Sequence, residues 1–246
     1  MVTNPRIIAR IDIKGSRLVK GIRFEGQRVY GSAGDYIKKY YEESADEILL
    51  IDTVASLYER NSLNDIIDFS TKNSFIPVTV EGGIRSISDM KNVLLKGADK
   101  IAVNSGAIEN KILIKELSAE FGSQSVVSSI QAKKRSKNNW EAFCLNGRHA
   151  SGIDVLSWAK EVQSLGAGEI LLSSVDCDGV GKGMDFELIK EISNNVDIPV
   201  IASSGASSIE EIKFILSNTN ISGIAIGKLL HEKVLSIQDI KKALDL

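Results

Sequence analysis

The sequence has few of the residues that mark several common classes of protein. Its 246 residues include two cysteines, Cys144 and Cys177, too few for a disulfide framework. The two histidines, His149 and His231, are too few for a histidine-built metal site. We therefore expect neither a metal nor a cofactor. No apolar run approaches the roughly 18 residues that span a bilayer, and the start lacks the apolar core of a secretory signal. We expect a cytoplasmic protein with no membrane segment.

The chain also lacks an excess of charge of either sign. Lys and Arg total 30 and Asp and Glu total 32, which gives a formal net charge of −2. This balance offers no electrostatic reason to bind nucleic acid or an anionic membrane. Only three prolines are present and the glycines are scattered, so no linker-like stretch divides the chain. We expect one domain over residues 1–246.

What the chain does contain is a series of short apolar runs separated by segments with helical spacing. Strands that are apolar throughout are typical of a parallel sheet covered by helices. Eight such strand–helix units in about 250 residues match a (β/α)8 TIM barrel of the α/β class, which we prefer to an open doubly wound sheet. The expected strands are 7–13, 47–52, 77–81, 100–104, 125–131, 169–174, 199–203 and 223–227. The expected helices are 36–43, 63–72, 88–96, 111–121, 154–165, 187–193, 210–216 and 239–244.

An internal repeat indicates how this barrel is built. The tetrapeptide Glu-Ile-Leu-Leu at 47–50 recurs at 169–172, and the tripeptide Ile-Pro-Val at 76–78 recurs at 198–200, both at a shift of 122 residues. A common shift near half the chain length indicates an internal duplication. We expect two duplicated half-barrels, roughly 1–122 and 123–246.

Polar residues at the carboxyl ends of the strands are the candidates for chemistry, because such barrels carry their active sites there. Asp12 closes the first strand. From the residue alone, it is either a partly desolvated general acid or base or a loop-capping aspartate. The repeat places Gln131, at the end of the fifth strand, opposite Asp12 in the duplicated pattern.

Glycines and small polar residues follow the strands in both halves. Backbone amides freed by such turns form nests that bind phosphate. Two nests across one barrel mouth predict a long substrate with a phosphate at each end. The nest residues are Gly83, Asn104 and Ser105 in the first half and Asp178, Gly179, Gly205 and Gly227 in the second.

Two basic loops flank these nests. The long loop expected over 14–32 contains Lys20, whose charge could attract or cover an anionic substrate. The loop after the fifth strand carries a basic run at 133–137, which we interpret as a solvated charge run.

Four charged residues lie at or beside the opposite ends of the strands: Arg6, Glu47, Lys100 and Glu169. Taken singly they are rim residues. Because their signs alternate, they could instead pair as a ring that closes the barrel floor, as a structural plug or a gate.

Longer motifs lie along the chain: IARIDIK at 8–14, LVKG at 18–21, DTVAS at 52–56 followed by Arg60, GGIR at 82–85, GADK at 97–100, FGSQ at 121–124, GAGEIL at 166–171 and DCDG at 176–179. In these motifs the chain resembles the cyclase subunit family of imidazole glycerol phosphate synthase, across essentially all of 7–230. Ala55 and Ser56 with Arg60 separate it from the related phosphoribosyl isomerase.

The resemblance implies ammonia chemistry. A partner glutaminase would form a heterodimer with the chain and release ammonia. The ammonia would cross the barrel and attack a bisphosphorylated aminoimidazole-carboxamide ribonucleotide to give imidazole glycerol phosphate. The resemblance also implies that Asp12 is a general acid/base, that the seven nest residues and Lys20 bind substrate, and that the four floor charges form an ammonia gate.

Several positions depart from the family's pattern. The second catalytic carboxylate is replaced by Gln131, whose carboxamide exchanges no proton near neutral pH. Glu81 replaces the first of three glycines and places an anion near one phosphate nest. Ser204 stands where glycine is usual, and the last strand ends in Gly227 and Lys228.

These departures leave alternatives open. The first hypothesis is a working cyclase in which Gln131 still orients the substrate. The second is an altered relative that conducts ammonia to a separate sugar amidotransferase of surface-glycan synthesis. A ligand-binding pseudoenzyme is a weaker third.

Overall fold

The computed structural model describes residues 4–55 and 63–246 of the chain. Ser56 and Arg60, which belong to one of the family motifs, lie outside the described residues.

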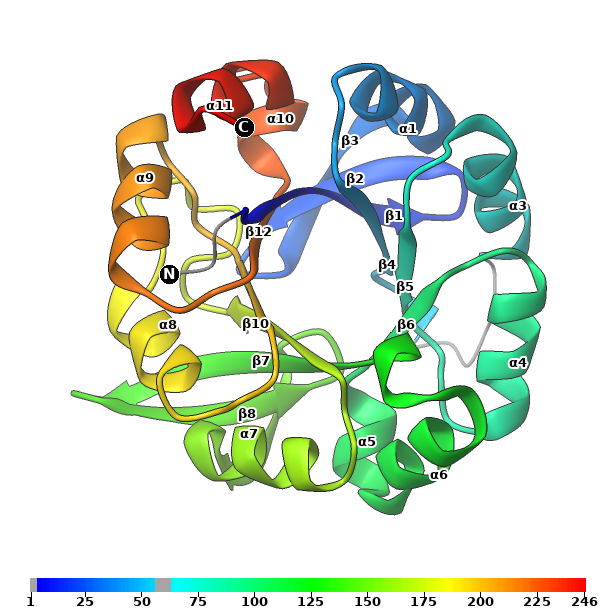
Figure 1. Ribbon diagram of the computed structural model, residues 1–246, viewed down its shortest axis with the longest axis vertical. Helices are drawn as coiled ribbons and strands as arrows, with labels where there is room; N and C mark the ends of the chain where they lie inside the picture. Colours follow the sequence, from blue (N-terminus) through cyan, green and yellow to red (C-terminus); the bar gives the residue numbers. More distant parts are fainter. Residues whose placement is uncertain (1–3, 56–62) are drawn as a thin grey trace.

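Eight parallel strands close into a barrel within the described ranges, with the helices around the outside (Figure 1). β12 pairs with β1, with Arg6 opposite Gly223, and this pairing closes the ring. The prediction of a (β/α)8 barrel is confirmed. The barrel strands are β1 (Arg6–Lys14), β4 (Glu47–Asp52), β5 (Val78–Glu81), β6 (Lys100–Val103), β7 (Val126–Ser136), β10 (Glu169–Ser174), β11 (Val200–Ser203) and β12 (Gly223–Ile226).

The outer helices begin where the sequence supplies capping side chains. Ser86, Asp154, Asp185, Ser208 and Ser236 each accept a hydrogen bond from a backbone N–H in the first turn of the helix that follows. The α-helices are α1 (Ala33–Glu42), α3 (Asn64–Asn73), α4 (Ile87–Leu95), α5 (Ser105–Glu109), α6 (Ile112–Phe121), α7 (Val155–Ser164), α8 (Phe186–Ser193), α9 (Ile209–Asn218), α10 (Lys228–His231) and α11 (Ile237–Leu244). A 3₁₀ turn, η1, occupies Ser123–Ser125.

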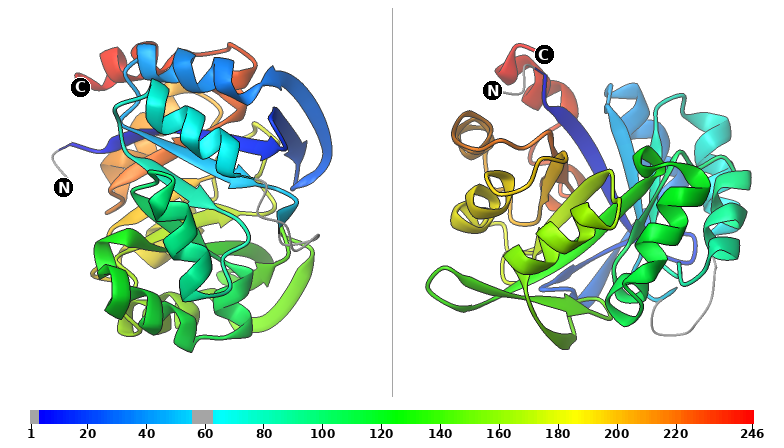
Figure 2. Two further views of the ribbon diagram at one scale, coloured as in Figure 1. Left: turned by 90° about the vertical axis from the view of Figure 1, so that its right-hand side faces the viewer. Right: turned by 60° about the horizontal axis from the view of Figure 1, so that its bottom comes forward.

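The two segments expected as loops after the first and fifth barrel strands are instead antiparallel hairpins. β2 (Arg17–Ile22) and β3 (Glu25–Ser32) follow β1, and β8 (Asn139–Cys144) and β9 (His149–Asp154) follow β7. Figure 2 shows both hairpins at the end of the barrel toward which β1 points. Most of β3 is exposed, so it lacks the apolar run that identifies a buried strand. The basic run at 133–137 is largely exposed on the β7–β8 hairpin, as expected.

The shared order of elements supports an internal duplication. In both halves a barrel strand is followed by a hairpin and then a helix: β1, β2, β3 and α1 in the first, and β7, β8, β9 and α7 in the second. The boundary near residue 122 stays a prediction.

The residues of β1 alternate between two cores. Ile7, Ala9, Ile11 and Ile13 pack with the helices in the outer core. Ile8 belongs to a separate apolar layer inside the barrel. Because neighbouring side chains of a strand point to opposite faces, Arg6, Arg10 and Asp12 share the inward face with Ile8. The apolar layer therefore lies between Arg6 at one end of the barrel and Asp12 at the other. Its members are Ile8, Leu49, Ile51, Ala102, Val127, Leu171, Ile201 and Ala225.

No helix in the described part of the chain has the length and apolar character needed to cross a membrane.

Candidate active site

Four charged side chains meet at the carboxyl ends of the strands, and we call Arg10, Asp12, Lys20 and Asp178 the mouth cluster. Arg10 Nε lies 2.7 Å from Asp12 Oδ1, and Arg10 Nη1 lies 3.0 Å from Asp178 Oδ1. Lys20 Nζ lies 2.7 Å from Asp12 Oδ2 and 2.9 Å from Asp178 Oδ1. Each cation thus contacts both carboxylates. None of the four residues is more than 6% exposed.

The hairpin after β1 explains why Lys20 reaches this cluster. β2 folds back along the end of β1, with Ile13 opposite Leu18, and carries Lys20 over the barrel mouth. The expectation that Lys20 lies in a loop is therefore wrong, because the residue belongs to a strand and is buried.

The mouth cluster keeps Asp12 ionised. Burial alone would raise the pKa of Asp12, but the charges and hydrogen bonds of Arg10 and Lys20 outweigh it and hold that pKa well below its usual range. Asp12 is therefore an anion at neutral pH, able to stabilise positive charge.

Arg10 was missed as a site residue because it stands inside an otherwise apolar run. One signal could have found it, since residues two apart on a strand share a face and Arg10 therefore points the same way as Asp12. Its guanidinium also lies over the ring of Phe24, 5.4 Å from the centroid.

Ser204, the departure from glycine, is tied into the mouth cluster. It adopts a left-handed backbone with φ of 82°, which costs an L-residue about 1–2 kcal/mol. Its hydroxyl donates to Asp178 Oδ1 at 2.9 Å and accepts from Arg10 Nη1 at 3.1 Å. These two hydrogen bonds offset the backbone strain, and glycine, which has no side chain, could not make them.

The nest residues of the second half gather around one pocket beside the mouth cluster. Gly179 has φ of 68°, and a Cβ there would overlap the carbonyl oxygen of Gly21, so only glycine fits. Asp178 Oδ2 is buried and has no hydrogen-bond partner among the residues that the structure describes. The lining of this pocket includes Lys20, Asp178, Gly179, Gly205, Gly227 and Lys228.

The nest residues of the first half line a second pocket across the mouth, together with Glu81 and Gln131. Gly83, Asn104 and Ser105 all lie in its wall. The Asn104 amide donates to the carbonyl oxygens of Ser129 and Phe143, both at 3.0 Å, so its nitrogen already holds β6 against β7 and β8. An anion in this pocket would therefore meet backbone groups more readily than the Asn104 amide.

Glu81 and Gln131 form a second polar group at the mouth. Ser129 Oγ donates to Glu81 Oε1 at 2.8 Å, and Gln131 Oε1 accepts from the Gly147 amide at 2.7 Å. Gln131 also acts on Glu81 and favours its ionised form. Burial raises the pKa of Glu81 to about 7, although the bond from Ser129 and the charge of Arg10 oppose the rise. The sequence pattern marked Glu81 as a departure from glycine that places an anion near one phosphate nest, and Glu81 does line that pocket.

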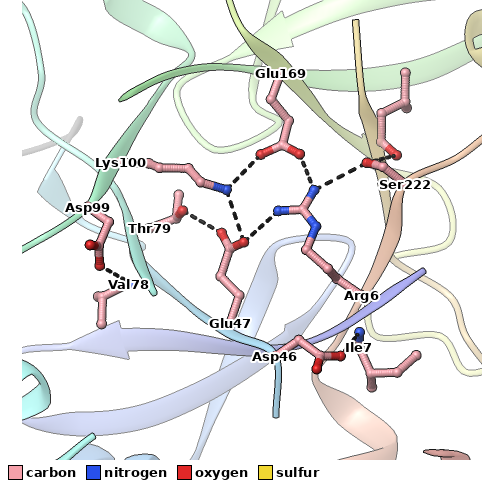
Figure 3. A network of polar contacts seen from close by, with 11 residues as sticks. Arg6, Ile7, Asp46, Glu47, Val78, Thr79, Asp99, Lys100, Glu169 and Ser222 are labelled. Atoms are coloured by element: carbon pink, nitrogen blue, oxygen red, sulfur yellow. Dashed lines mark hydrogen bonds and ion pairs between the residues drawn. The ribbon is translucent and has the colours of Figure 1, made fainter. Parts of the chain in front are cut away.

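The four floor charges pair as a closed ring at the opposite end of the barrel, which we call the floor ring (Figure 3). Arg6 bonds Glu47 at 2.7 Å and also Glu169. Lys100 Nζ lies 3.0 Å from a carboxylate oxygen of each glutamate. Burial alone would lower the pKa of Arg6, but the two carboxylates raise it overall. The floor charges are therefore not separate rim residues.

The two histidines lie outside both clusters. His231 is buried on the outside of the barrel, with Nδ1 2.7 Å from the hydroxyl of Tyr40. Burial lowers its pKa to about 3, so the ring is neutral and packs against aromatic neighbours. His149 is exposed. Across residues 4–55 and 63–246, no cluster of His, Cys, Asp and Glu could hold a metal ion.

The sequence of this chain is similar to those of several named proteins. The sequence pattern of the histidine biosynthesis protein family matches residues 6–236. A Legionella pneumophila protein named imidazole glycerol phosphate synthase subunit HisF is 50% identical over 210 residues, 85% of this chain and 99% of that protein. The subunit of the same name from Prochlorococcus marinus strain AS9601 is 43% identical over 238 residues, 96% of this chain and 93% of its own. That from Streptococcus mutans is 42% identical over 239 residues, 97% of this chain and 95% of its own.

Proposed function

The chain belongs to the histidine biosynthesis protein family, and from that membership we propose that it is a cyclase-type subunit of an imidazole glycerol phosphate synthase. In this role it takes ammonia from a partner glutaminase. The ammonia reacts with a bisphosphorylated aminoimidazole-carboxamide ribonucleotide, and imidazole glycerol phosphate is formed.

One observation carries the proposal: two glycine-rich pockets lie on opposite sides of one barrel mouth, with Asp12 between them. One pocket is built from β5, β6 and β7, and the other from the segments after β10, β11 and β12. A substrate with a phosphate at each end would bridge them and place its middle over Asp12. The ionised Asp12 would then stabilise positive charge that develops on the attacking nitrogen.

The floor of the barrel supports the proposal of a glutaminase partner. Phe75 and Leu95 are 83% and 75% exposed and lie just before β5 and β6, on the same end of the barrel as the floor ring. Exposed apolar side chains of this kind fit a protein interface. Ammonia released there would have to pass the floor ring, which supports a gating role for Arg6, Glu47, Lys100 and Glu169.

The test is turnover of the bisphosphorylated ribonucleotide by the purified chain, driven by an ammonium salt. We expect turnover that is lost in Asp12→Asn, and glutamine-driven turnover once the partner glutaminase is added. A chain that is folded and saturated with ammonia but forms no imidazole glycerol phosphate would contradict the proposal.

The conduit hypothesis remains a second candidate on one observation. Asp12 is bound by Arg10 and Lys20, and position 131 carries no acid. The comparisons do not favour it, because the similar proteins cited above carry the name of the cyclase-type subunit. Two results together would support it: no ammonia-driven turnover by the chain, and turnover restored by Gln131→Asp.

A further inference from the structure

We propose that Glu81 is the second acid/base carboxylate of this site, in place of the carboxylate absent at position 131, and that Gln131 positions it. The inference rests on the proposed cyclase function and assigns the proton transfer of that reaction to a particular side chain.

The position of Glu81 in the barrel places its carboxyl group inside the mouth. Glu81 ends β5, where it pairs with Ile51 of β4 and Ala102 of β6. Both neighbours belong to the apolar layer inside the barrel, so Glu81 points inward as well. It is 7% exposed and lines the pocket that contains Gly83 and Ser105.

The carboxyl group of Glu81 reaches across to the strand from which a carboxylate is missing. Its Oε1 accepts a hydrogen bond of 2.8 Å from Ser129 Oγ, on β7. Ser129 and Gln131 are two residues apart on that strand and share its inward face. The acid on β5 therefore lies directly beside the position that an acid on β7 would occupy.

Gln131 is suited to hold Glu81 in a way that an aspartate is not. Its carbonyl oxygen accepts from the Gly147 amide in the turn between β8 and β9, at 2.7 Å. The same side chain also acts on Glu81 and favours its ionised form. A carboxamide can accept at one atom and donate from the other, whereas a carboxylate can only accept. An aspartate at 131 would repel Glu81, so the two departures from the family pattern fit together.

The environments of Asp12 and Glu81 separate their proton affinities. The charged groups acting on Glu81 are Arg10, which favours its ionised form, and Asp12, which opposes it, both from β1. Burial outweighs the attraction and raises the pKa of Glu81 to about 7, while that of Asp12 stays well below its usual range. Two carboxyl groups with separated pKa values can take different roles. Asp12 then remains an anion, and Glu81 gains and loses the proton.

The step assigned to Glu81 is a balanced proton transfer. When ammonia adds to a carbonyl-type carbon, the nitrogen lone pair forms the C–N bond and the carbonyl electron pair moves to oxygen. The nitrogen then holds one proton too many and the oxygen one too few. The Glu81 carboxylate takes the proton from nitrogen, and the resulting acid gives it to oxygen. No further reactant is needed.

The experiment compares wild type with Glu81→Gln and with Glu187→Gln, an exposed glutamate on α8 that serves as the matched control. Ammonia-driven kcat and KM are measured from pH 5.5 to 9, with rates expressed per concentration of neutral ammonia. We expect Glu81→Gln to lower kcat by about 10²–10⁴-fold with little change in KM. The change in kcat near pH 7 in the wild-type pH profile should be absent from that variant. The profile of Glu187→Gln should match that of wild type.

A double variant tests the pairing of the two departures. Glu81→Gly with Gln131→Asp recreates the family's usual pattern and should regain much of the kcat that Glu81→Gly alone loses. The aspartate introduced on β7 would supply the acid that the glycine removes.

The outcomes separate this inference from the proposed function. If wild type converts the substrate, and Glu81→Gln keeps both the wild-type kcat and the change in kcat near pH 7, the inference is overturned and the cyclase function stands. A wild-type profile without any ionisation between pH 6 and 8 overturns it without any variant. If wild type shows no ammonia-driven turnover, the proposed function fails and the inference fails with it.

Discussion

The barrel contains the same charge arrangement twice, once at each end. The floor ring and the mouth cluster each consist of one arginine, one lysine and two carboxylates, and in both each cation contacts both carboxylates. They differ in their access to water. The side chains of Arg6 and Lys100 are 27% and 18% exposed, whereas those of Arg10 and Lys20 are 2% and 5% exposed.

This contrast in access to water determines what each end can do. Charges that keep contact with water separate at a smaller cost than charges that are fully desolvated. The floor ring therefore suits a closure that opens and reforms. The mouth cluster suits a fixed electrostatic environment. The mouth also holds Glu81, another carboxyl group, which no cation contacts directly among the described residues and whose pKa of about 7 lets it gain or lose a proton near neutral pH.

The strongest predicted change separates the two ends by chemistry. Asp12→Asn removes the anion at the mouth and should lower ammonia-driven turnover by about 10²–10⁴-fold. Glu47→Gln at the floor should leave turnover driven by an ammonium salt close to wild type, since that ammonia enters at the mouth. Steady-state kinetics with the ammonium salt measures both. Equal losses in the two variants would remove the functional distinction between the ends.

The next effect separates the ends by stability. Arg10→Met leaves Asp12 and Asp178 buried with Lys20 as their remaining cation. We expect a loss of about 3–5 kcal/mol in the free energy of unfolding, the usual cost of removing one partner of a buried ion pair. Arg6→Met should cost less, because water reaches the floor ring. Urea denaturation at pH 7 gives both values, and a larger loss at the floor would reverse the comparison.

A third prediction concerns the pH dependence of stability that Glu81 introduces. Its folded-state pKa of about 7 lies above the ordinary value of 4.5. The stability that its protonated form contributes is therefore complete below pH 4.5 and lost as the pH rises through 7. Glu81→Gln should remove this loss and make the protein more stable than wild type at pH 8, by up to about 3 kcal/mol. Urea midpoints at pH 5 and pH 8 measure it.

Two results would contradict this third prediction. One is a wild-type stability that does not fall between pH 5 and pH 8 by more than that of Glu81→Gln. The other is an equal gain at pH 8 in the Glu187→Gln control.

The weakest predicted change concerns the role of the floor. In the assembled complex with a glutaminase, Glu47→Gln weakens the contacts of Arg6 and Lys100. We expect a few-fold change in the ratio of glutamine-driven to ammonia-driven turnover, because only the first route passes the floor ring. A ratio identical to that of wild type would leave the ring with a purely structural role.

The sequence predicted the barrel well where burial is complete. The predicted bounds of β4 and β10 agree with the structure, because every residue of these strands is buried and the apolar run ends with the strand. The hairpins escaped prediction because strands such as β3 face water and carry no such run. Each half of the chain places its hairpin directly after its first barrel strand, but the pattern of apolar residues does not reveal this repeat.

The sequence identified most residues of the candidate site but few of the contacts between them. Asp12, Lys20 and Asp178 were singled out, and the structure brings them together. Arg10 was overlooked inside an apolar run, although its spacing of two residues from Asp12 places both on one face of β1. The contact of Glu81 with Ser129 joins residues 48 positions apart, on β5 and β7, the two strands that flank β6. No local spacing carries that information. The roles of these residues stay predictions.

The apolar layer between the two clusters has a consequence for how such a protein can change. Arg6 and Arg10 are four residues apart on β1, about 13 Å along the strand at the usual rise, with Ile8 of the apolar layer between them. Substitutions at one end therefore need no compensating substitution at the other. The chemistry at the mouth can therefore change in evolution while the floor ring, and the glutaminase interface proposed beside it, stay unchanged.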